Sequence, residues 1–331
     1  MEPHRHARVP DLSQRRALVT GAAGFIGAYV VDGLAAAGYN VAALDAFDDT
    51  VYAASLKRQR AERLRQEHGV ETLTLDLADV GAVVDLLDSA KPDVVIHLGA
   101  LANPRRSVSA PRAYVESNIV ATSNLLDAMR TAGVGKLVFA SSSTVYGADR
   151  TFPWREDLPC DRPLAPYAAT KRSAELLCHA YHVIAGLDVC VLRFFSAYGP
   201  WGRPDMMPMI VTRALFDGET FTLFDGGAPK RDFTYVGDIA AGVVSAAERV
   251  CGFETINLGR GEPIAMIDFV RTLESIVGKP ALFDTKPLPP SEAPITYADI
   301  ARARALLGYN PTVTLEDGLA RLVDWYRAHG E

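Results

Sequence analysis

The sequence predicts an α/β fold, in which a doubly wound parallel sheet is followed by a smaller C-terminal lobe. From Ala17 to about Phe194, short apolar and β-branched runs alternate with longer segments of helical period, which is the pattern of βαβ units around a parallel sheet. After Gly199 the regular alternation ends, because segments rich in proline and glycine, such as PWGRPDMMP and KPLPPSEAP, separate shorter elements. These two observations place the larger unit first in the chain.

The first unit alternates strands with helices in chain order. Its expected strands are short apolar runs, at 17–20, 40–45, 71–75, 93–98, 136–142 and 188–195. Its expected helices show the helical period, at 25–37, 79–89, 111–132 and 167–185. Glycine follows three of these helices, where a left-handed C-cap is expected, at Gly38, Gly133 and Gly186.

The two ends of the chain differ from this regular part. Residues 1–16 are polar and basic and lack the apolar core of a signal peptide, so we expect a flexible tail there. Residues 17–195 then form the predicted first domain, and residues 196–331 mainly form the second lobe. Segments near 236–260, a helix followed by the strand TINL, are expected to return to the first sheet.

The composition excludes several classes of protein. The 331 residues carry 40 acidic against 34 basic side chains, and this net charge of -6 argues against non-specific nucleic-acid binding. No stretch approaches the roughly 18 to 20 uninterrupted apolar residues of a membrane span. The four cysteines show no CxxC spacing and no metal-like pairing with histidine, so we expect reduced cysteines in a cytoplasmic protein without a metal site.

The segment ALVTGAAGFIGAYVVDGLAAAGYNVAALD combines a strand, a glycine turn, a helix, a second strand and a terminal acid. Gly21 permits the tight turn, Gly24 lets backbone amides approach a pyrophosphate, and Gly27 lets the helix pack close to the strand. The helix N-terminus attracts the negative charge. Asp45 ends the second strand, where its carboxylate binds an adenosine ribose and repels a 2′-phosphate, which favours NAD over NADP. These features predict an NAD-binding Rossmann domain.

A second pattern lies in PYAATKRSAELL, where Tyr167 and Lys171 are four residues apart and share one helix face. A tyrosine phenol ionises near pH 10, but a lysine ammonium and a cationic nicotinamide beside it favour the phenolate. Tyr167 is therefore a candidate general base for a hydroxyl proton. A hydroxyl cluster in KLVFASSSTVYG, which includes Ser142, stands at the carboxyl end of a strand, where ligands bind in open α/β sheets.

The GxxGxxG spacing, the hydroxyl cluster and YxxxK together resemble the extended short-chain dehydrogenase/reductase family, specifically its sugar-nucleotide epimerases and dehydratases. The resemblance covers nearly the whole chain. It implies that Ser142 binds the sugar hydroxyl at carbon 4, that Tyr167 is the base, and that Lys171 holds the nicotinamide ribose. The cofactor contacts that it implies elsewhere lie at the glycine turn, the start of the first helix, two acids and a strand-end loop: Gly21, Gly24, Phe25, Ile26, Gly27, Asp45, Asp76, Leu77, Leu98 and Ala100.

The residues after Ser142 indicate the type of reaction. Family 4,6-dehydratases carry an Asp-Glu pair there, and UDP-glucuronate decarboxylases also place Glu at this point, whereas this chain has Ser143 and Thr144. Because no acid stands there to protonate a leaving group, the resemblance favours simple 4-epimerisation of a UDP-sugar.

The second half of the chain indicates the sugar. VLRFFSAYGPWGRPDMMP and KRDFTYVGDIAAGV, together with the insert VYAASLKRQRAERL, look like the UDP-glucuronate 4-epimerase branch of the family. Arg203 and Arg231 are then candidates for the substrate diphosphate or the uronate carboxylate, since a guanidinium binds either group with two hydrogen bonds.

Two departures from this branch lie on the substrate side. Where the branch commonly reads AGVRYS this chain has ANPRRS, which introduces Asn103, Pro104 and Arg106. Where the branch commonly has Gly-Asp this chain has Ser291 and Glu292, and the glutamate retains a carboxylate for a uridine ribose hydroxyl.

The predicted mechanism is a transient oxidation at carbon 4. Tyr167 removes the hydroxyl proton while hydride passes to NAD, the 4-keto sugar rotates, and hydride returns to its other face. With glucuronate this intermediate is a β-keto acid, which loses carbon dioxide unless its carboxylate is restrained. The hydroxyls available for that restraint are Ser142, Ser143, Thr144 and Ser196.

Three alternatives remain from the sequence. A UDP-glucose or other neutral-hexose 4-epimerase would not depend on the uronate carboxylate, and a UDP-glucuronate decarboxylase is disfavoured by Thr144. A catalytically inactive NAD-sensing protein is disfavoured by the presence of both Tyr167 and Lys171. The resemblance also implies a homodimer through the helices near 111–132 and 167–185, although their apolar faces fit an intramolecular core equally well.

Overall fold

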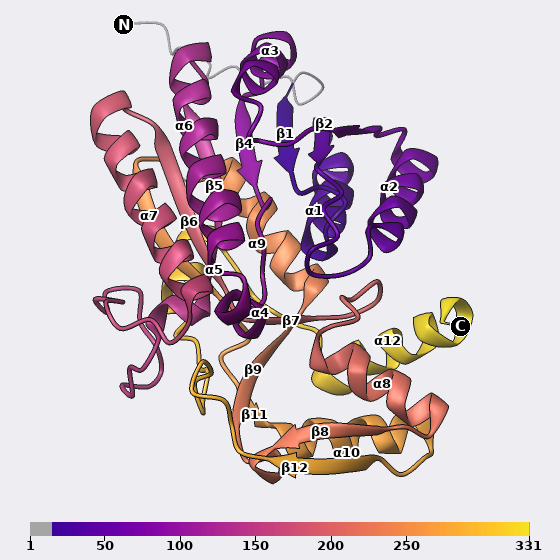
Figure 1. Ribbon diagram of the computed structural model, residues 1–331. Coiled ribbons are helices and arrows are strands. Elements are labelled where there is room, and N and C mark those ends of the chain that lie inside the picture. The colour runs from indigo at the N-terminus through magenta and orange to yellow at the C-terminus, as the bar shows by residue number, and fades with distance from the viewer. Residues whose placement is uncertain (1–14, 250, 331) are drawn as a thin grey trace, which may run out of the picture.

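The computed structural model describes residues 15–249 and 251–330, so most of the expected tail at 1–16 lies outside the described residues. The chain forms a larger upper lobe around one sheet and a smaller lower lobe (Figure 1). None of the helices in the described ranges has both the length and the apolar character needed to cross a membrane.

The larger lobe is built on a seven-stranded sheet in the order β10-β6-β5-β4-β1-β2-β3. All neighbouring strands in it run parallel, which confirms the predicted α/β class. Its members are β1 (Arg16–Thr20), β2 (Asn40–Asp45), β3 (Thr72–Thr74), β4 (Val94–His97), β5 (Lys136–Ser142), β6 (Asp188–Phe194) and β10 (Phe253–Leu258). Their carboxyl ends point toward the smaller lobe (Figure 1).

Helices cover both faces of this sheet because successive strand residues alternate between two apolar cores. Leu18, Val95 and Phe139 face the core beneath α3 (Val80–Ala90), α6 (Ala121–Ala132) and α7 (Pro166–Ala185). Their neighbours Val19, Ile96 and Val138 face the core on the other side of the sheet, beneath α1 (Phe25–Ala36), α2 (Ala54–His68), α9 (Val236–Arg249) and α11 (Ala301–Leu307).

The expected helix at 111–132 is one continuous rod with an irregular middle. It consists of α5 (Pro111–Val115), a π-helical segment (Glu116–Val120) and α6. The buried Asn118 lies in the π-helical segment, where its side chain binds the backbone of Leu101 through Oδ1 at 2.8 Å and Nδ2 at 2.9 Å. This segment therefore anchors the loop that follows β4.

The smaller lobe has its own apolar core. A three-stranded sheet joins β7 (Ser196–Tyr198), β9 (Lys230–Tyr235) and β11 (Pro263–Ala265), and a second sheet pairs β8 (Thr220–Phe224) with β12 (Leu282–Lys286). Packed on these sheets are α8 (Met207–Asp217), α10 (Met266–Val277) and α12 (Leu315–His329). Phe233 of β9 stacks on Phe269 of α10 with ring centroids 4.3 Å apart.

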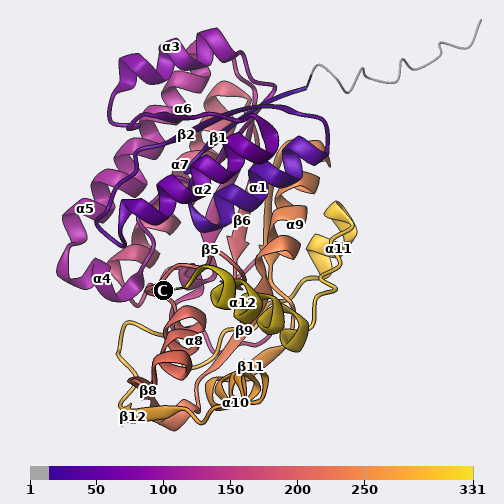
Figure 2. The ribbon, with the colours of Figure 1, turned by 90° about the vertical axis from the view of Figure 1, so that its right-hand side faces the viewer.

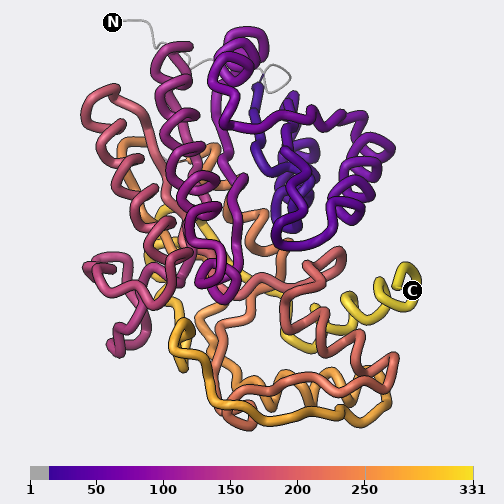
Figure 3. Tube along the Cα trace, in the orientation of Figure 1, coloured from indigo at the N-terminus to yellow at the C-terminus, as the bar shows by residue number. Residues whose placement is uncertain are grey.

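The chain crosses between the lobes more than once (Figure 3). After the first passage through the smaller lobe, α9 packs against α1, and β10 then pairs with β6 at the edge of the large sheet. The expected helix and strand near 236–260 thus lie in the larger lobe. The short helix α4 (Pro104–Ser109) follows the loop after β4 and stands where the two lobes meet (Figure 2).

Candidate active site

A cleft of about 790 Å³ lies between the carboxyl ends of the strands and the smaller lobe. Every residue that the sequence marked as a candidate for cofactor, catalysis or substrate lines it. The large sheet provides the glycine turn and the hydroxyl cluster, α7 provides Tyr167 and Lys171, and the smaller lobe provides Arg203, Arg231 and Glu292.

The glycine turn has no room for side chains. Gly21 has a φ of +68°, and a Cβ there would lie 2.7 Å from the backbone nitrogen of Gly99. A Cβ on Gly27 would lie 2.1 Å from the carbonyl oxygen of Gly21. Glycine is therefore required at both positions, for the left-handed turn and for the close approach of α1 to β1.

The amino end of α1 opens into the cleft. Gly24 is the N-cap residue, and no side chain of the described residues caps the first turn, whose members Phe25, Ile26 and Gly27 line the cleft. Free amides and the helix dipole at this point suit a diphosphate. Asp45, Asp76, Leu77, Leu98 and Ala100 line the adjoining part of the cleft, so the residues present fit a bound NAD.

Asp45 is buried, with 5% of its surface exposed. Its Oδ2 accepts from the backbone nitrogen of Ala23 at 3.1 Å, and its Oδ1 accepts from that of Phe47 at 2.8 Å. The carboxylate thus holds the glycine turn against the end of β2. Asp76 is exposed and accepts from the backbone nitrogen of Ala78 at 2.9 Å.

Tyr167 and Lys171 occupy successive turns of α7, and both are buried against the end of β5. The backbone nitrogen of Tyr167 donates to Ser107 Oγ at 3.0 Å, which fixes the start of α7 to α4. The Tyr167 ring packs edge-on against Tyr114, with ring centroids 6.1 Å apart. Ser142 ends β5, and its Oγ accepts from Thr144 Oγ1 at 3.0 Å.

Burial and nearby groups act in opposite directions on these two side chains. Burial raises the pKa of Tyr167, while hydrogen bonding with Ser142 and the charge of Arg203 lower it. Burial lowers the pKa of Lys171 to about 8, and the carboxylate of Glu175 opposes that shift. The Lys171 Nζ also lies 4.9 Å from the centroid of the Phe139 ring. Burial therefore disfavours the charged form of both side chains, and the phenolate depends on nearby hydrogen bonds and positive charge.

The hydroxyl cluster continues beyond Ser142. Ser143 is buried, Thr144 is half-buried, and Ser196 of β7 reaches the same cleft from the smaller lobe. These side chains give the wall beside Tyr167 hydrogen-bonding groups without charge.

Arg203 lines the cleft, where its guanidinium is already paired with a carboxylate and a backbone carbonyl. Its Nε and Nη2 donate to Asp205 at 3.0 and 2.7 Å, and Nη2 also donates to the carbonyl of Ala102. Asn103 Nδ2 donates to the same Asp205 oxygen that Arg203 Nη2 contacts, at 2.8 Å. The departure at Asn103 thus belongs to an Arg203, Asp205 and Asn103 network that joins α4 to the smaller lobe. Asp205 was not predicted, because only the fold brings it to Asn103.

Arg231 forms a second charged group at the far end of the cleft. Its Nη2 lies 3.0 Å from Glu292 Oε2, and Arg105 Nε lies 2.7 Å from Glu292 Oε1. Burial lowers the pKa of Arg231, but Glu292 opposes this effect. Two guanidinium groups share one carboxylate here, so a net positive charge faces this part of the cleft. Arg105 was not predicted, and its position between two departures from the branch pattern was the available signal.

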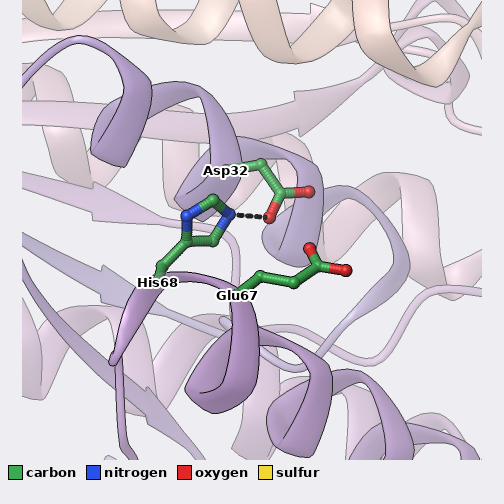
Figure 4. A group of neighbouring side chains, drawn as sticks. All are labelled: Asp32, Glu67 and His68. Carbon is green, nitrogen blue, oxygen red and sulfur yellow. Dashed lines mark hydrogen bonds and ion pairs between the residues drawn. The ribbon is translucent and has the colours of Figure 1, made fainter.

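One group of possible metal ligands occurs among residues 15–249 and 251–330, on the outer surface of α1 and α2. Asp32, Glu67 and His68 converge there, and His68 Nε2 lies 2.9 Å from Asp32 Oδ1 (Figure 4). Arg63 lies 2.8 Å from Asp32 and 2.6 Å from Glu67, so both carboxylates already pair with a guanidinium. A cation would have to displace that charge, and the group is outside the cleft.

Comparison with known proteins gives the same assignment over most of the chain. The model of the NAD dependent epimerase/dehydratase family matches residues 17–259. A UDP-glucuronate 4-epimerase of Thermodesulfobacterium geofontis (strain OPF15) is 39% identical over 315 residues, covering 95% of this chain and 97% of the relative.

Solved structures of epimerases are similar to this chain over nearly its whole length. The UDP-glucuronic acid 4-epimerase of Bacillus cereus in complex with UDP-glucuronic acid and NAD superposes with a TM-score of 0.89 at 36% identity, over 95% of this chain and 99% of that one. The UDP-glucose 4-epimerase of Thermus thermophilus in complex with NAD gives 0.85 at 30% identity, over 95% and 99%. These findings confirm the resemblance predicted from the glycine turn and YxxxK, and the chain belongs to the NAD dependent epimerase/dehydratase family.

Proposed function

We propose that this enzyme inverts carbon 4 of a UDP-sugar with NAD as its cofactor, and that UDP-glucuronate and UDP-galacturonate are its substrate and product. One observation carries the proposal: Ser142, Tyr167 and Lys171 meet the NAD turn in a single cleft whose hydroxyl cluster contains no acid. The relative from T. geofontis and the B. cereus structure, both named for UDP-glucuronate epimerisation, support this choice of sugar.

The residues of the larger lobe hold the cofactor. Gly21, Gly24 and Gly27 with the amides of Phe25 and Ile26 receive the diphosphate, and Asp45 and Asp76 with Leu77 receive the adenosine. Leu98 and Ala100 lie along the dinucleotide, and Lys171 holds the nicotinamide ribose. When bound, NAD accepts the hydrogen of carbon 4 as hydride and later returns it.

Tyr167 moves the proton. Its phenolate takes the proton of the hydroxyl at carbon 4, holds it on Oη while the sugar is a ketone, and gives it back when the alcohol is restored. Lys171 stabilises the phenolate by its charge, and the Ser142 hydroxyl orients the reacting oxygen by a hydrogen bond. No proton acceptor other than Tyr167 is required for the full cycle.

The surrounding polar groups keep the intermediate intact. A 4-ketouronate loses carbon dioxide when its carboxylate turns perpendicular to the ketone, so the carboxylate must be held. We assign this task to the hydroxyls of Ser143, Thr144 and Ser196 together with Arg203, whose guanidinium already lies at this end of the cleft. Arg231 and Glu292 then receive the diphosphate and the uridine ribose.

The test is product identification. Purified protein is incubated with NAD and UDP-glucuronate, and the nucleotide sugars are separated by chromatography. UDP-galacturonate without carbon dioxide release supports the proposal. UDP-xylose identifies a decarboxylase, and turnover of UDP-glucose with no turnover of UDP-glucuronate identifies the neutral-hexose alternative, for which the T. thermophilus structure is the precedent. An absence of NAD reduction in a single turnover with every UDP-sugar indicates an NAD-sensing protein.

We also propose that the protein is a homodimer formed through the helices at 111–132 and 167–185. Large apolar side chains are exposed on these helices and on α4: Val108, Val115, Val120, Leu176, Val183 and Ile184. A second copy is the partner that covers such a patch on both chains.

Leu176→Glu should convert the dimer to a monomer in analytical ultracentrifugation. Leu306→Glu, which changes an exposed apolar residue on α11, should leave it unchanged.

We further propose that the enzyme is located in the cytoplasm. All four cysteines are free and three are buried, which suits a reducing compartment.

We also assign the cofactor and the sugar nucleotide to separate parts of the chain. Residues 17–195 provide the residues that bind NAD, whereas residues 196–331 supply most of the sugar-nucleotide contacts.

A further inference from the structure

Arg60 of α2 is a buried cation that joins three separate segments of the chain. The side chain has no exposed surface. Its Nη1 donates to the carbonyl oxygen of Ala23 at 3.2 Å and to Tyr52 Oη at 3.0 Å. Its Nε and Nη2 donate to the carbonyl oxygen of Trp201 at 3.1 and 2.6 Å. Ala23 belongs to the glycine turn, and Trp201 belongs to the loop 199–203.

The charge of Arg60 has no directly paired anion among residues 15–249 and 251–330. All of its hydrogen bonds go to uncharged oxygens, and among the described residues no carboxylate lies within ion-pair distance of it, although Asp45 acts on it from further away. A guanidinium stays charged even when buried, and an uncompensated buried charge is expensive. The N–H donors of the guanidinium explain its hydrogen bonds, but these bonds leave its charge without a directly paired carboxylate among the described residues.

Two of the three segments that Arg60 joins belong to different proposed sites. Ala23 lies between Gly21 and Gly24, at the turn that receives the dinucleotide diphosphate. Trp201 precedes Arg203 by two residues, and its positive φ of 60° is a conformation that non-glycine residues rarely adopt. The Trp201 ring lies 5.2 Å from that of Trp325 of α12, so the loop is held from both sides.

We propose that Arg60 is a positioning residue that couples the NAD site to the substrate loop 199–203. The diphosphate on the glycine turn supplies the missing negative charge, which strengthens the hold of Arg60 on both carbonyls and thereby fixes the loop that carries Arg203. The identity of the two ligands rests on the proposed function. The coupling itself concerns only the charge of Arg60 and the contacts described above.

Hydrogen–deuterium exchange of the loop tests the coupling without turnover. NAD should slow amide exchange across the loop 199–203 at least fivefold in the unaltered protein, and this effect should disappear in Arg60→Met. Arg60→Lys keeps the charge and should restore part of the protection. Arg63→Met is the matched control, since it removes a charge one turn further along α2 from a residue that has carboxylate partners, and NAD should protect its loop normally. Equal protection by NAD in Arg60→Met and Arg63→Met overturns the proposal.

Binding measurements provide the second readout. NAD should tighten the affinity for UDP at least fivefold in the unaltered protein and in Arg63→Met, but less than twofold in Arg60→Met. If Arg60→Met does not fold, Tyr52→Phe removes one of the acceptors and should reduce the coupling without abolishing it; unchanged coupling in that variant counts against the proposal. If UDP does not bind at all, the proposed substrate class is wrong, whereas the exchange experiment with NAD alone still decides the role of Arg60.

Tyr29 provides an internal comparison. Its hydroxyl donates to the carbonyl oxygen of Pro200 at 3.2 Å, so α1 also touches the substrate loop, but through a neutral group. Tyr29→Phe should speed exchange in the loop with and without NAD by the same factor. A loss of the NAD effect in Tyr29→Phe, with the effect retained in Arg60→Met, would assign the coupling to packing of α1 and refute the role of the charge.

Discussion

In the proposed mechanism Tyr167 must lose its proton, although burial opposes its ionisation. Its pKa is raised by burial and lowered by Ser142 and Arg203, so the site relies on neighbouring groups to make the phenolate accessible. Tyr167→Phe should reduce kcat by about 10³-fold, within the range for a lost general base, and should leave UDP affinity unchanged. Tyr114→Phe is the control, since it removes a phenol that contacts the Tyr167 ring and donates to the carbonyl of Asn103. Near-normal turnover in Tyr167→Phe would refute the assigned base.

Lys171 makes stability depend on pH. Burial lowers its folded pKa to about 8 from 10.5, so below pH 8 both folded and unfolded chains are protonated and the full cost of the buried ammonium is present. Between pH 8 and 10.5 the unfolded chain binds more protons, and stability therefore rises with pH. Lys171→Met should stabilise the NAD-free protein at pH 7 by about 3 kcal/mol, and the gain should fade by pH 10.5. Urea unfolding across this range measures it, and a gain independent of pH would point to packing instead.

Arg203 should distinguish acidic from neutral sugars. Arg203→Ala should lower kcat/KM for UDP-glucuronate by about tenfold or more, because it removes a charged partner of the uronate. The loss with UDP-glucose should be smaller. Arg105→Ala provides the contrast, since Arg105 pairs with Glu292 at the end of the cleft that we propose for the nucleotide, and its removal should affect both sugars alike. Equal losses with both sugars in Arg203→Ala would assign that arginine to the diphosphate.

At the scale of elements, α7 is held in register by a buried ion pair. Arg193 of β6 donates to Glu175 through Nε and Nη2, both at 2.9 Å, and Ser141 Oγ of β5 donates to Glu175 at 2.6 Å. Glu175 lies one turn beyond Lys171, and Ser141 precedes Ser142, so this brace fixes the spacing between the proposed catalytic groups. The position of α7 against β5 therefore depends on charge as well as on apolar packing.

Glu175→Gln should destabilise the protein by about 3–5 kcal/mol, because Arg193 would remain buried without its anion. Arg172→Gln is the control, since Arg172 contacts the same carboxylate at 2.8 Å but is 31% exposed, and its loss should cost about 1 kcal/mol or less. The urea midpoint of each variant measures the difference. Equal midpoints for the two variants would show that the brace does not depend on the buried pair.

Elements with a clear apolar period were predictable from the sequence, whereas others were not. The sheet strands and α1 follow from β-branched runs and the glycine turn. The helix α2 was missed because its polar sequence buries only Arg60 and Leu64, which leaves almost no apolar stripe to recognise. In the π-helical segment, the Asn118 side chain accepts from the backbone nitrogen of Leu101 and donates to its carbonyl oxygen, and no local pattern encodes those contacts.

In the candidate site, too, some features were predictable from the sequence and others were not. Gly21, Asp45, Tyr167 and Lys171 were predictable because each lies in a local pattern whose chemistry is explicit. The pairings among the charged and polar residues were not, since Asn103 and Asp205 are 102 residues apart in the chain and Arg231 and Glu292 are 61 apart. Contact between the two lobes brings Asn103 to Asp205, whereas the folding of the smaller lobe brings Arg231 to Glu292. Local patterns in the sequence therefore predict the candidate reactive groups, which line one cleft, but not the ion pairs around them.

For the whole molecule, ligand removal should be visible as a loss of stability. NAD at about 100 times its Kd should stabilise the folded chain by about 2.7 kcal/mol, since it binds the folded state only. This corresponds to a Tm increase of about 4 °C for a chain of this size. NADP at the same concentration should give a much smaller shift, because the Asp45 carboxylate repels a 2′-phosphate. Equal Tm shifts with NAD and NADP would show that Asp45 does not discriminate against a 2′-phosphate on the adenosine ribose.

The return of α9 and β10 to the large sheet has a consequence for how the protein is made on the ribosome. When residue 195 has just been synthesised, β6 is still an open sheet edge, and the face beneath α1 lacks Ile239, Val243 and the other apolar side chains of α9. The nascent cofactor unit therefore stays incomplete until residues beyond 258 have left the exit tunnel. A messenger truncated at the lobe boundary should yield an aggregating fragment, and co-translational chaperones should remain bound until late in synthesis.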